Sequence, residues 1–240
     1  MTVSRRRVRA IIRKELHDYR RNSTLVLAMA VLPVMFVIPP LVQVFTLPPS
    51  AATALGHQPA LLYMLGIPVL VPAAPAAYAV VGERLQGTLE PVLTTPISRA
   101  ELLLGKALAA LVPSLGVAYG VFALFLAATE LFAHPAVAAA FVSGPGLLAQ
   151  LLFTPPLALS SIWIGITVSA RARDPRVAGQ VAVLLSLPGV AVTTLVAYRV
   201  IPATPPTALV AAAALLLFCV LGWRTAAAAV GRERLLAGAG

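Results

Sequence analysis

The sequence has 240 residues, of which 60% are hydrophobic and only 11% are charged, and its mean hydropathy is +0.93. A soluble domain of this size would carry about 25% charged residues, so the composition argues against a soluble fold and indicates a membrane protein. The net charge of +10 would also suit a nucleic-acid partner, but the basic residues form short clusters between apolar runs, which favours a topology signal.

The chain opens with a basic segment, RRRVRAIIRKELHDYRR. A helix here places Val8, Ile12, Leu16 and Tyr19 on one stripe, with Ile11 beside it and the charges on the other faces. Two interpretations stay open. The segment is either a basic signal that orients the next span, or an amphipathic helix that lies on the bilayer or against a cytoplasmic partner.

Six apolar segments then reach the roughly 20 residues that a helix needs to cross the hydrocarbon core. The first exceeds the apolar run of a cleaved signal peptide and is expected to remain as an anchor. The predicted spans are residues 24–45, 60–81, 102–127, 146–170, 177–197 and 207–223.

The positions of lysine and arginine predict the orientation of these spans. All 18 basic residues except Arg199 fall before the first span or after the second, fourth and sixth, and cytoplasmic segments retain positive charge. Both termini are therefore expected in the cytoplasm. The fold class is all-α and polytopic, with one domain over 1–240 that comprises a cytoplasmic amphipathic segment (1–23), a six-helix bundle (24–223) and a cytoplasmic tail (224–240).

The spans contain many prolines and almost no ionisable groups. Each interior proline removes a backbone hydrogen bond, so we expect these helices to pack together or line a cavity. Lys106 and Arg199 lie near span ends, where their side chains are expected to snorkel. Because the spans hold no carboxylate or histidine of the kind that ion-coupled transporters use, energy for transport would come from outside them.

The segment between the second and third spans reads GERLQGTLEPVLTTPISRAELLLGK. Its charges make burial in hydrocarbon too costly, and it is longer than a plain connection needs. Leu85, Leu89, Val92 and Leu93 share one helical face, whereas Pro91 indicates a break. Ser98 and Glu101 form a capping box that starts the third span. This pattern predicts an amphipathic cytoplasmic coupling helix.

The same segment resembles the pattern E-x-x-x-G-T-x-E-x-L-x-x-T-P-x-S-R-x-E-x-x-x-G-K of ABC-2 type permeases, the membrane subunits of ABC exporters. The order of a basic helix followed by six spans extends the resemblance over nearly the whole chain. One departure is the short connection YRVIPATPP, which puts in doubt the re-entrant helices of many relatives. The matching residues are Glu83, Gly87, Thr88, Glu90, Thr95, Pro96, Arg99, Glu101, Gly105 and Lys106.

The resemblance implies a permease of an ATP-driven exporter in the plasma membrane, and the heavy use of Arg, Ala and Pro suggests a bacterial coding sequence. It pairs with a second permease, identical or related, and with a cytoplasmic ATPase dimer that binds ATP and Mg. The chain has no G-x-x-x-x-G-K-[ST] phosphate loop, so the ATPase is expected on a separate chain, and this one is expected to bind no cofactor and no nucleic acid. The expected polar contacts with the ATPase are Arg99, Glu90 and Glu101. The implied ATPase-coupling residues are Glu83, Gly87, Thr88, Glu90, Thr95, Pro96, Arg99 and Glu101.

Two other functions stay open at this stage. Glu83 and Glu90 lie seven residues apart on one helical face, as an acid/base pair of a membrane-embedded enzyme would, and a passive assembly factor would need no transport at all. The three histidines, His17, His57 and His134, lie in separate segments, so no shared metal site is expected. The substrate is not indicated beyond a weak preference of uncharged spans for an amphipathic or apolar solute.

Overall fold

The computed structural model describes residues 3–46, 48, 50, 60–87, 97–141 and 144–230, and the regular elements of these residues are all helical. Six stretches are long and apolar enough to cross a membrane, as predicted. Each extends past the predicted bounds at one end or both. They are Ser23–Thr46, Leu61–Leu85, Arg99–Phe132, Gly144–Arg171, Pro175–Ala197 and Pro205–Ala229.

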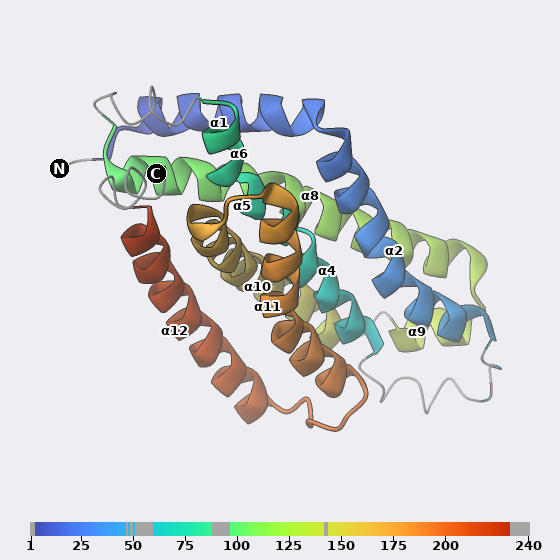
Figure 1. Ribbon diagram of the computed structural model, residues 1–240. Helices are drawn as coiled ribbons and strands as arrows, with labels where there is room; N and C mark the ends of the chain where they lie inside the picture. Colours follow the sequence, from blue (N-terminus) through green and yellow to red (C-terminus); the bar gives the residue numbers. More distant parts are fainter. Residues whose placement is uncertain are drawn as a thin grey trace.

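Helix α1 (Arg5–Arg21) lies across one end of the bundle, and α2 (Ser23–Thr46) runs from there to the opposite end (Figure 1). The longest helix, α8 (Arg99–Phe132), starts beneath α1 and is followed by the short helix α9 (Pro135–Phe141), which the sequence did not predict. Because α8 has 34 residues, it is longer than the hydrocarbon core is thick and must tilt or extend beyond the core.

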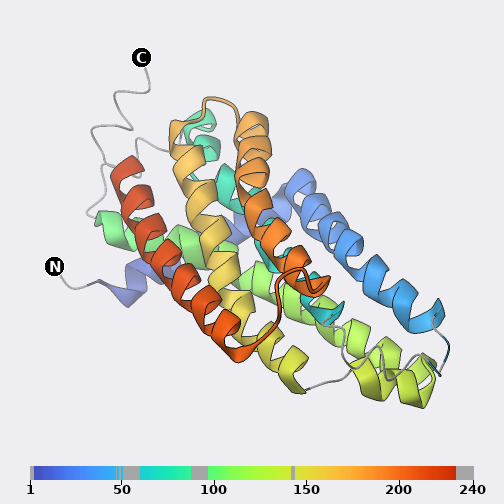
Figure 2. The ribbon, with the colours of Figure 1, turned by 90° about the horizontal axis from the view of Figure 1, so that it is seen from below.

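The remaining spans are α10 (Gly144–Arg171), α11 (Pro175–Ala197) and α12 (Pro205–Ala229), which lie side by side in two views (Figures 1 and 2). Asp174 caps the start of helix α11, and its side chain accepts hydrogen bonds from the backbone N–H groups of Arg176 and Val177 at 2.7 and 3.1 Å. The connection 198–204 forms no helix, as its short length indicated. Helix α12 continues to Ala229, so Arg224 belongs to this helix and not to a separate tail.

The second span passes through the middle of the bundle in pieces. It consists of η2 (Ala60–Leu65), α4 (Gly66–Leu70), α5 (Ala73–Tyr78) and α6 (Val81–Leu85), packed against α10 and α11. Pro72 and Pro75 lack the N–H groups that a continuous helix would use here. Prolines in the first, third, fourth and fifth spans instead lie inside continuous helices, so the predicted bends become breaks only in the second span.

The core is built around these pieces of the second span. Two large clusters of buried apolar residues surround them, one around η2 and α4 and one around α5 at the α1 end. At Gly165 of α10, an added Cβ would lie 2.5 Å from the Ala76 Cβ and 3.1 Å from the Ala76 carbonyl carbon. Helix α10 therefore needs a glycine here to approach the backbone of α5.

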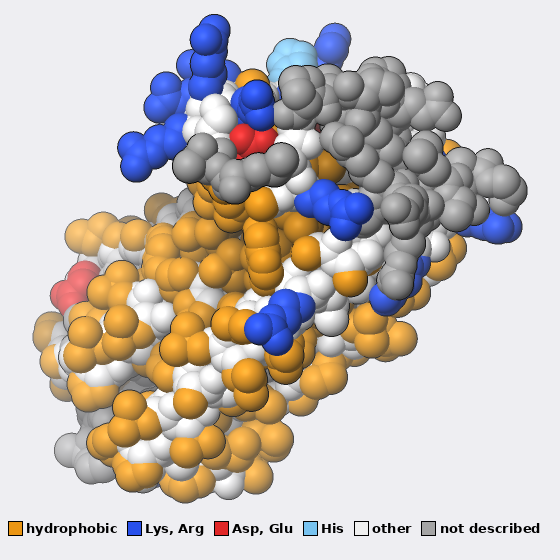
Figure 3. Space-filling view, turned by 90° about the vertical axis from the view of Figure 1, so that its left-hand side faces the viewer, with side chains coloured by type: hydrophobic (Ala, Val, Ile, Leu, Met, Phe, Trp, Pro, Cys, Tyr) orange, Lys and Arg blue, Asp and Glu red, His pale blue; other side chains and the backbone are white. Residues whose placement is uncertain are grey.

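The outer surface is mostly apolar. On the face drawn in Figure 3, lysine and arginine gather toward the α1 end, and hydrophobic side chains cover most of the rest. Leu27, Leu184 and Leu209 are among the large apolar side chains that are more than half exposed on α2, α11 and α12. Such a surface suits lipid and not water, so the chain is a multi-pass membrane protein.

Candidate functional site

Helix α1 packs on the first turns of α8. Its buried residues are Val8, Ile11, Glu15 and Tyr19. Of the predicted stripe, Val8 and Tyr19 are buried, whereas Ile12 and Leu16 are partly buried and pack against the apolar cluster that contains Tyr19. The expectation that all charges lie on other faces was wrong at Glu15, which is 4% exposed.

The contact between α1 and α8 depends on Gly105. A Cβ atom added at this position would lie 2.6 Å from Ile11 Cγ2 and 2.7 Å from Ile11 Cβ. These distances are far below van der Waals contact, so any larger residue at 105 would push α1 away. This gives a physical reason for the glycine in the Gly105–Lys106 pair.

Lys106 lies at the centre of a buried ion cluster, which we define as Lys14, Glu15, Glu83 and Lys106. The Lys106 ammonium lies 2.7 Å from Glu15 Oε1 and 2.9 Å from Glu83 Oε2, and it also donates to the carbonyl of Ala79. Lys14 donates to the other carboxylate oxygen of Glu83. Two cations and two anions make the cluster neutral, and the Lys106 ammonium lies among three oxygen atoms, the carbonyl of Ala79 and one carboxylate oxygen each of Glu15 and Glu83.

The expectation that Lys106 snorkels to the membrane surface was wrong. Its side chain is 1% exposed, because partners from α1 and the second span reach it inside the protein. A buried charge without such partners would be strongly destabilising, so the position of Lys106 depends on Glu15 and Glu83.

Two neighbours satisfy the backbone groups freed at the break between α5 and α6. Ser169 of α10 accepts hydrogen bonds from the backbone N–H groups of Val80 and Val81, at 2.9 and 3.0 Å. The carbonyl of Ala79 accepts from Lys106. The expectation that interior breaks are satisfied by packed neighbours is thus confirmed at this position.

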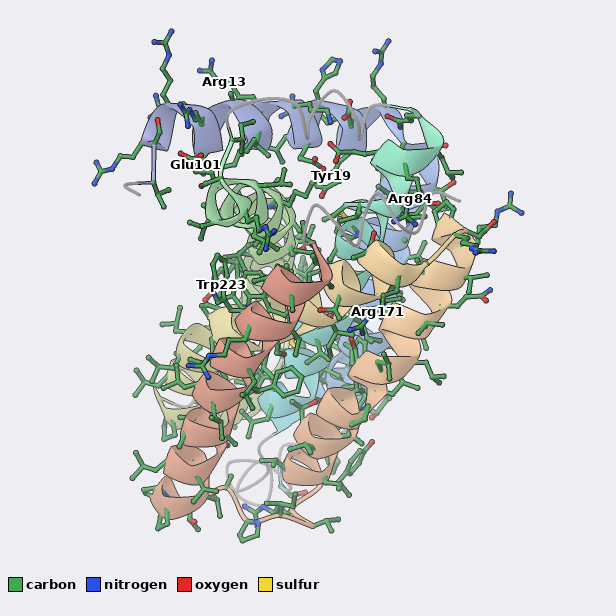
Figure 4. All side chains as sticks on the ribbon, turned by 60° about the vertical axis from the view of Figure 1, so that its left-hand side comes forward. Arg13, Tyr19, Arg84, Glu101, Arg171 and Trp223 are labelled. Atoms are coloured by element: carbon green, nitrogen blue, oxygen red, sulfur yellow. The ribbon has the colours of Figure 1, made fainter. Side chains whose placement is uncertain are left out.

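Arg84 joins the end of the second span to the end of α10. Its guanidinium donates to the carbonyls of Ala172 and Ala170, at 2.9 and 3.2 Å. The last carbonyls of a helix have no hydrogen-bond donors within that helix, and Arg84 provides donors for them. Figure 4 shows Arg84 near the end of the bundle that α1 covers.

Glu101 connects the starts of α1 and α8. Its carboxylate accepts hydrogen bonds from the backbone N–H groups of Ser98 and Ser4, each at 2.8 Å, and lies 3.5 Å from Arg7 Nη1. The Ser98 hydroxyl accepts from the Glu101 N–H at 3.2 Å, which completes the predicted capping box. Figure 4 places Glu101 directly beneath α1.

Tyr19 attaches the other end of α1 to the second span. It points from α1 toward the bundle, whereas Arg13 points away (Figure 4), and its hydroxyl donates to the carbonyl of Pro75 at 3.4 Å. Burial, together with the nearby Glu15 and Glu83 carboxylates, raises the pKa of Tyr19 well above its usual value. The phenol therefore stays a neutral hydrogen-bond donor.

A family model described as ABC-2 family transporter protein matches residues 9–209 of the chain. The chain belongs to the ABC-2 family of transporter proteins. No curated protein matches it. Membership of the ABC-2 family makes this chain a membrane permease of an ABC transporter. Members of the family generally pair with an ATPase subunit. The matched range contains the whole ion cluster and all of the predicted coupling residues.

The structure places the predicted coupling residues of this ABC-2 permease in two kinds of position. Glu83 and Glu101 are buried, at 7% and 1% exposure, and contact α1. Arg99 is exposed, and Gly87 follows α6 with a φ of 65°, a left-handed conformation that favours glycine. Thr88, Glu90, Thr95 and Pro96 lie outside the described residues, so their coupling role remains a prediction.

The sequence did not predict three site residues of the permease, Glu15, Lys14 and Ser169. A usable signal existed for Glu15, because it follows Val8 and Ile11 at helical spacing and thus lies within the buried stripe. Lys106 had a matching signal, since it is the one lysine inside the apolar run of the third span. Ser169 had no signal, because a serine near a span end is common in any membrane helix.

Proposed function

We propose that this permease belongs to an ATP-driven exporter in the plasma membrane, with α1 and both termini in the cytoplasm. A separate cytoplasmic ATPase dimer would bind ATP and Mg, and a second permease, identical or related, would complete the transporter. The sequence supports this arrangement, because it contains no phosphate-binding loop and its basic residues gather at one side.

The buried ion cluster is the observation that carries the proposal. It ties α1, the end of the second span and the start of α8 together. These elements flank residues 88–96, the segment that resembles the family's coupling element. A force on that segment would act on one connected unit and not on separate helices.

Force would reach the core through the second span. Helix α6 belongs to the connected unit, and α5 and α4 continue into the buried centre of the bundle. Side chains of other helices hold the break at Ala79 and Val80 in addition to the backbone hydrogen bonds there. The break can therefore act as a joint between the unit and the core. Movement there would shift the bundle between two accesses.

The proposed roles of the coupling residues follow their burial. Glu83 and Glu101 would hold α1 against the bundle, because α1 and the helix start use their carboxylates. The exposed Arg99 and the predicted exposed Glu90 would contact the ATPase. The coupling element would thus have a buried part that transmits force and a surface part that receives it.

Charge reversal at Glu90 tests this function. We expect Glu90→Lys to abolish the stimulation of ATP hydrolysis by the permease in reconstituted vesicles, because a contact between opposite charges becomes repulsive. Membrane insertion should be unchanged. Glu130→Lys is the matched control, since Glu130 is exposed near the other end of α8 and its reversal should leave stimulation intact.

Three outcomes would contradict the proposal. Normal stimulation with Glu90→Lys would remove the coupling role. Labelling of Glu90→Cys by an impermeant maleimide in intact cells, in a Cys219→Ala background, would place the segment on the wrong side. Catalytic turnover of a lipid or peptide by the isolated chain would favour the membrane-embedded enzyme instead.

A further inference from the structure

A small pocket lies at the end of the bundle opposite α1. Its volume is about 110 Å³, and it is lined by Pro39, Pro40 and Gln43 of α2, Tyr63 of η2, and Tyr198 and Arg199 after α11. A cavity needs about 10–15 Å³ of such volume to hold one water molecule, so the pocket has room for a phosphate-sized group. The polar end of a larger molecule would fit.

Arg199 is the first sign that the pocket binds a ligand. It is the one residue other than glycine with a positive φ among the described residues, at 60°. It ends α11 in a Schellman motif, in which the Arg199 N–H donates to Val196 O at 3.1 Å and the Val200 N–H to Leu195 O at 2.9 Å. Glycine is the usual residue at this position.

The fold alone does not explain an arginine there. The backbone conformation favours glycine, and an arginine in it is strained. The side chain is exposed at the pocket, and Arg199 takes part in none of the ion pairs found among the described residues. Strained residues gather at ligand sites, where the side chain offsets the cost.

Gln43 is the second and independent sign. Its Oε1 atom is buried and has no hydrogen-bond partner among the described residues. An amide oxygen accepts hydrogen bonds but does not donate them, and leaving it buried without a donor is costly. A ligand with a hydroxyl or amine group would satisfy it.

The pocket also lies between apolar surfaces. Ile38 and Val42 of α2 and Leu195 of α11 are 51%, 51% and 40% exposed. The rings of Tyr63 and Tyr198 meet edge to face at 6.3 Å, and tyrosine is enriched where membranes meet water. Hydrocarbon tails could lie along these helices while the head enters the pocket.

We infer that this pocket binds the head of an anionic lipid, a phosphodiester that carries a hydroxyl or amine donor. Arg199 pairs with the phosphate, because a guanidinium group presents a planar fork of N–H donors that fits phosphate oxygens. Gln43 accepts a hydrogen bond from the hydroxyl or amine of the head. The site is independent of the direction of transport and of the ATPase.

Titration of the purified permease with lipids, read by native mass spectrometry, tests the site. We expect phosphatidylglycerol to bind at least tenfold more tightly than phosphatidylcholine, whose head offers a phosphate but no donor. We expect the affinity for phosphatidylglycerol to fall at least tenfold in Arg199→Gly and in Gln43→Leu. Arg173→Gly is the matched control, because it removes an exposed arginine beside the other end of α11 and should change nothing.

Thermal unfolding of the same variants separates binding from folding. Arg199→Gly relieves backbone strain and should melt at the same temperature as the wild type or higher, although it loses the lipid. Equal affinity for the two lipids, or unchanged binding by Arg199→Gly, would overturn the inference. Binding of glycerol 3-phosphate as tight as that of the lipid would also overturn it, because the phosphate group in the pocket would then come from a soluble phosphate and not from a lipid.

Discussion

The second and sixth spans are both apolar enough to cross a membrane, but they occupy opposite environments. The second span lies in the centre of the bundle and is broken into short helices, whereas α12 is continuous and presents most of its apolar side chains to the outside. The break between α5 and α6 is satisfied by Lys106 and Ser169. Apolar composition thus selects a span, and polar partners from other helices permit it to be broken.

Of the changes that test this comparison, removing the charge of Lys106 should cause the largest loss of stability. Lys106→Met leaves the buried Glu15 and Glu83 without their main partner, and breaking a buried ion pair costs about 3–5 kcal/mol. We expect a matching loss of stability in denaturant titrations in detergent. Arg224→Met, at an exposed position of α12, is the control and should change stability by less than about 0.5 kcal/mol.

Equal stability of these two variants would mean that the ion cluster does not hold the second span in place. Adding Glu83→Met to Lys106→Met should recover part of the loss, because it leaves Lys14 and Glu15 as a neutral remainder. Failure of this double variant to recover any stability would indicate that packing and not charge is at fault.

Removing the acceptor at the break should have an intermediate effect. Ser169→Ala leaves the buried N–H groups of Val80 and Val81 unpaired, and such groups cost about 1–3 kcal/mol. Amide hydrogen exchange should rise at residues 80 and 81 before it rises elsewhere. Thr225→Ala is the control in the sixth span, since among the described residues the Thr225 hydroxyl bonds only to Gly222 of its own helix. A similar change there would contradict the comparison.

The smallest effect is expected on the outer face of the sixth span. Leu216 is 63% exposed, so Leu216→Ala should alter the stability of the purified permease by less than about 0.5 kcal/mol. The same truncation at the buried Leu65 of the second span should cost about 2–5 kcal/mol. Thermal melts of the two variants check this, and a large loss at Leu216 would show that the sixth span has a protein partner.

The elements that sequence analysis predicted correctly depend on local patterns. The six spans follow from apolar length, and the capping box follows from the spacing of Ser98 and Glu101. The family resemblance came from one segment with a specific order of charges and glycines, and the family match confirms it. The positions of the helix breaks were beyond this approach, because several prolines stay inside continuous helices.

The elements that it missed depend on contacts between distant segments. A lysine near a span end looks the same in sequence whether it reaches the surface or a buried carboxylate, so Lys106 was placed wrongly. Glu15 was assigned to a charged face because its partner was not known. Ser169 pairs with Val80, 89 positions earlier in the chain, and no local pattern indicates such a pair.

The docking of α1 also constrains how the chain can assemble. Its partners lie far downstream: Glu83 is 69 positions after Lys14, Lys106 is 91 after Glu15, and Glu101 is 97 after Ser4. Domains form from the N-terminus onward as the ribosome delivers the chain, so α1 emerges well before anything exists to receive it. Its many arginines would keep it at an anionic lipid surface in the meantime, and the arrival of the third span would then draw it onto the bundle.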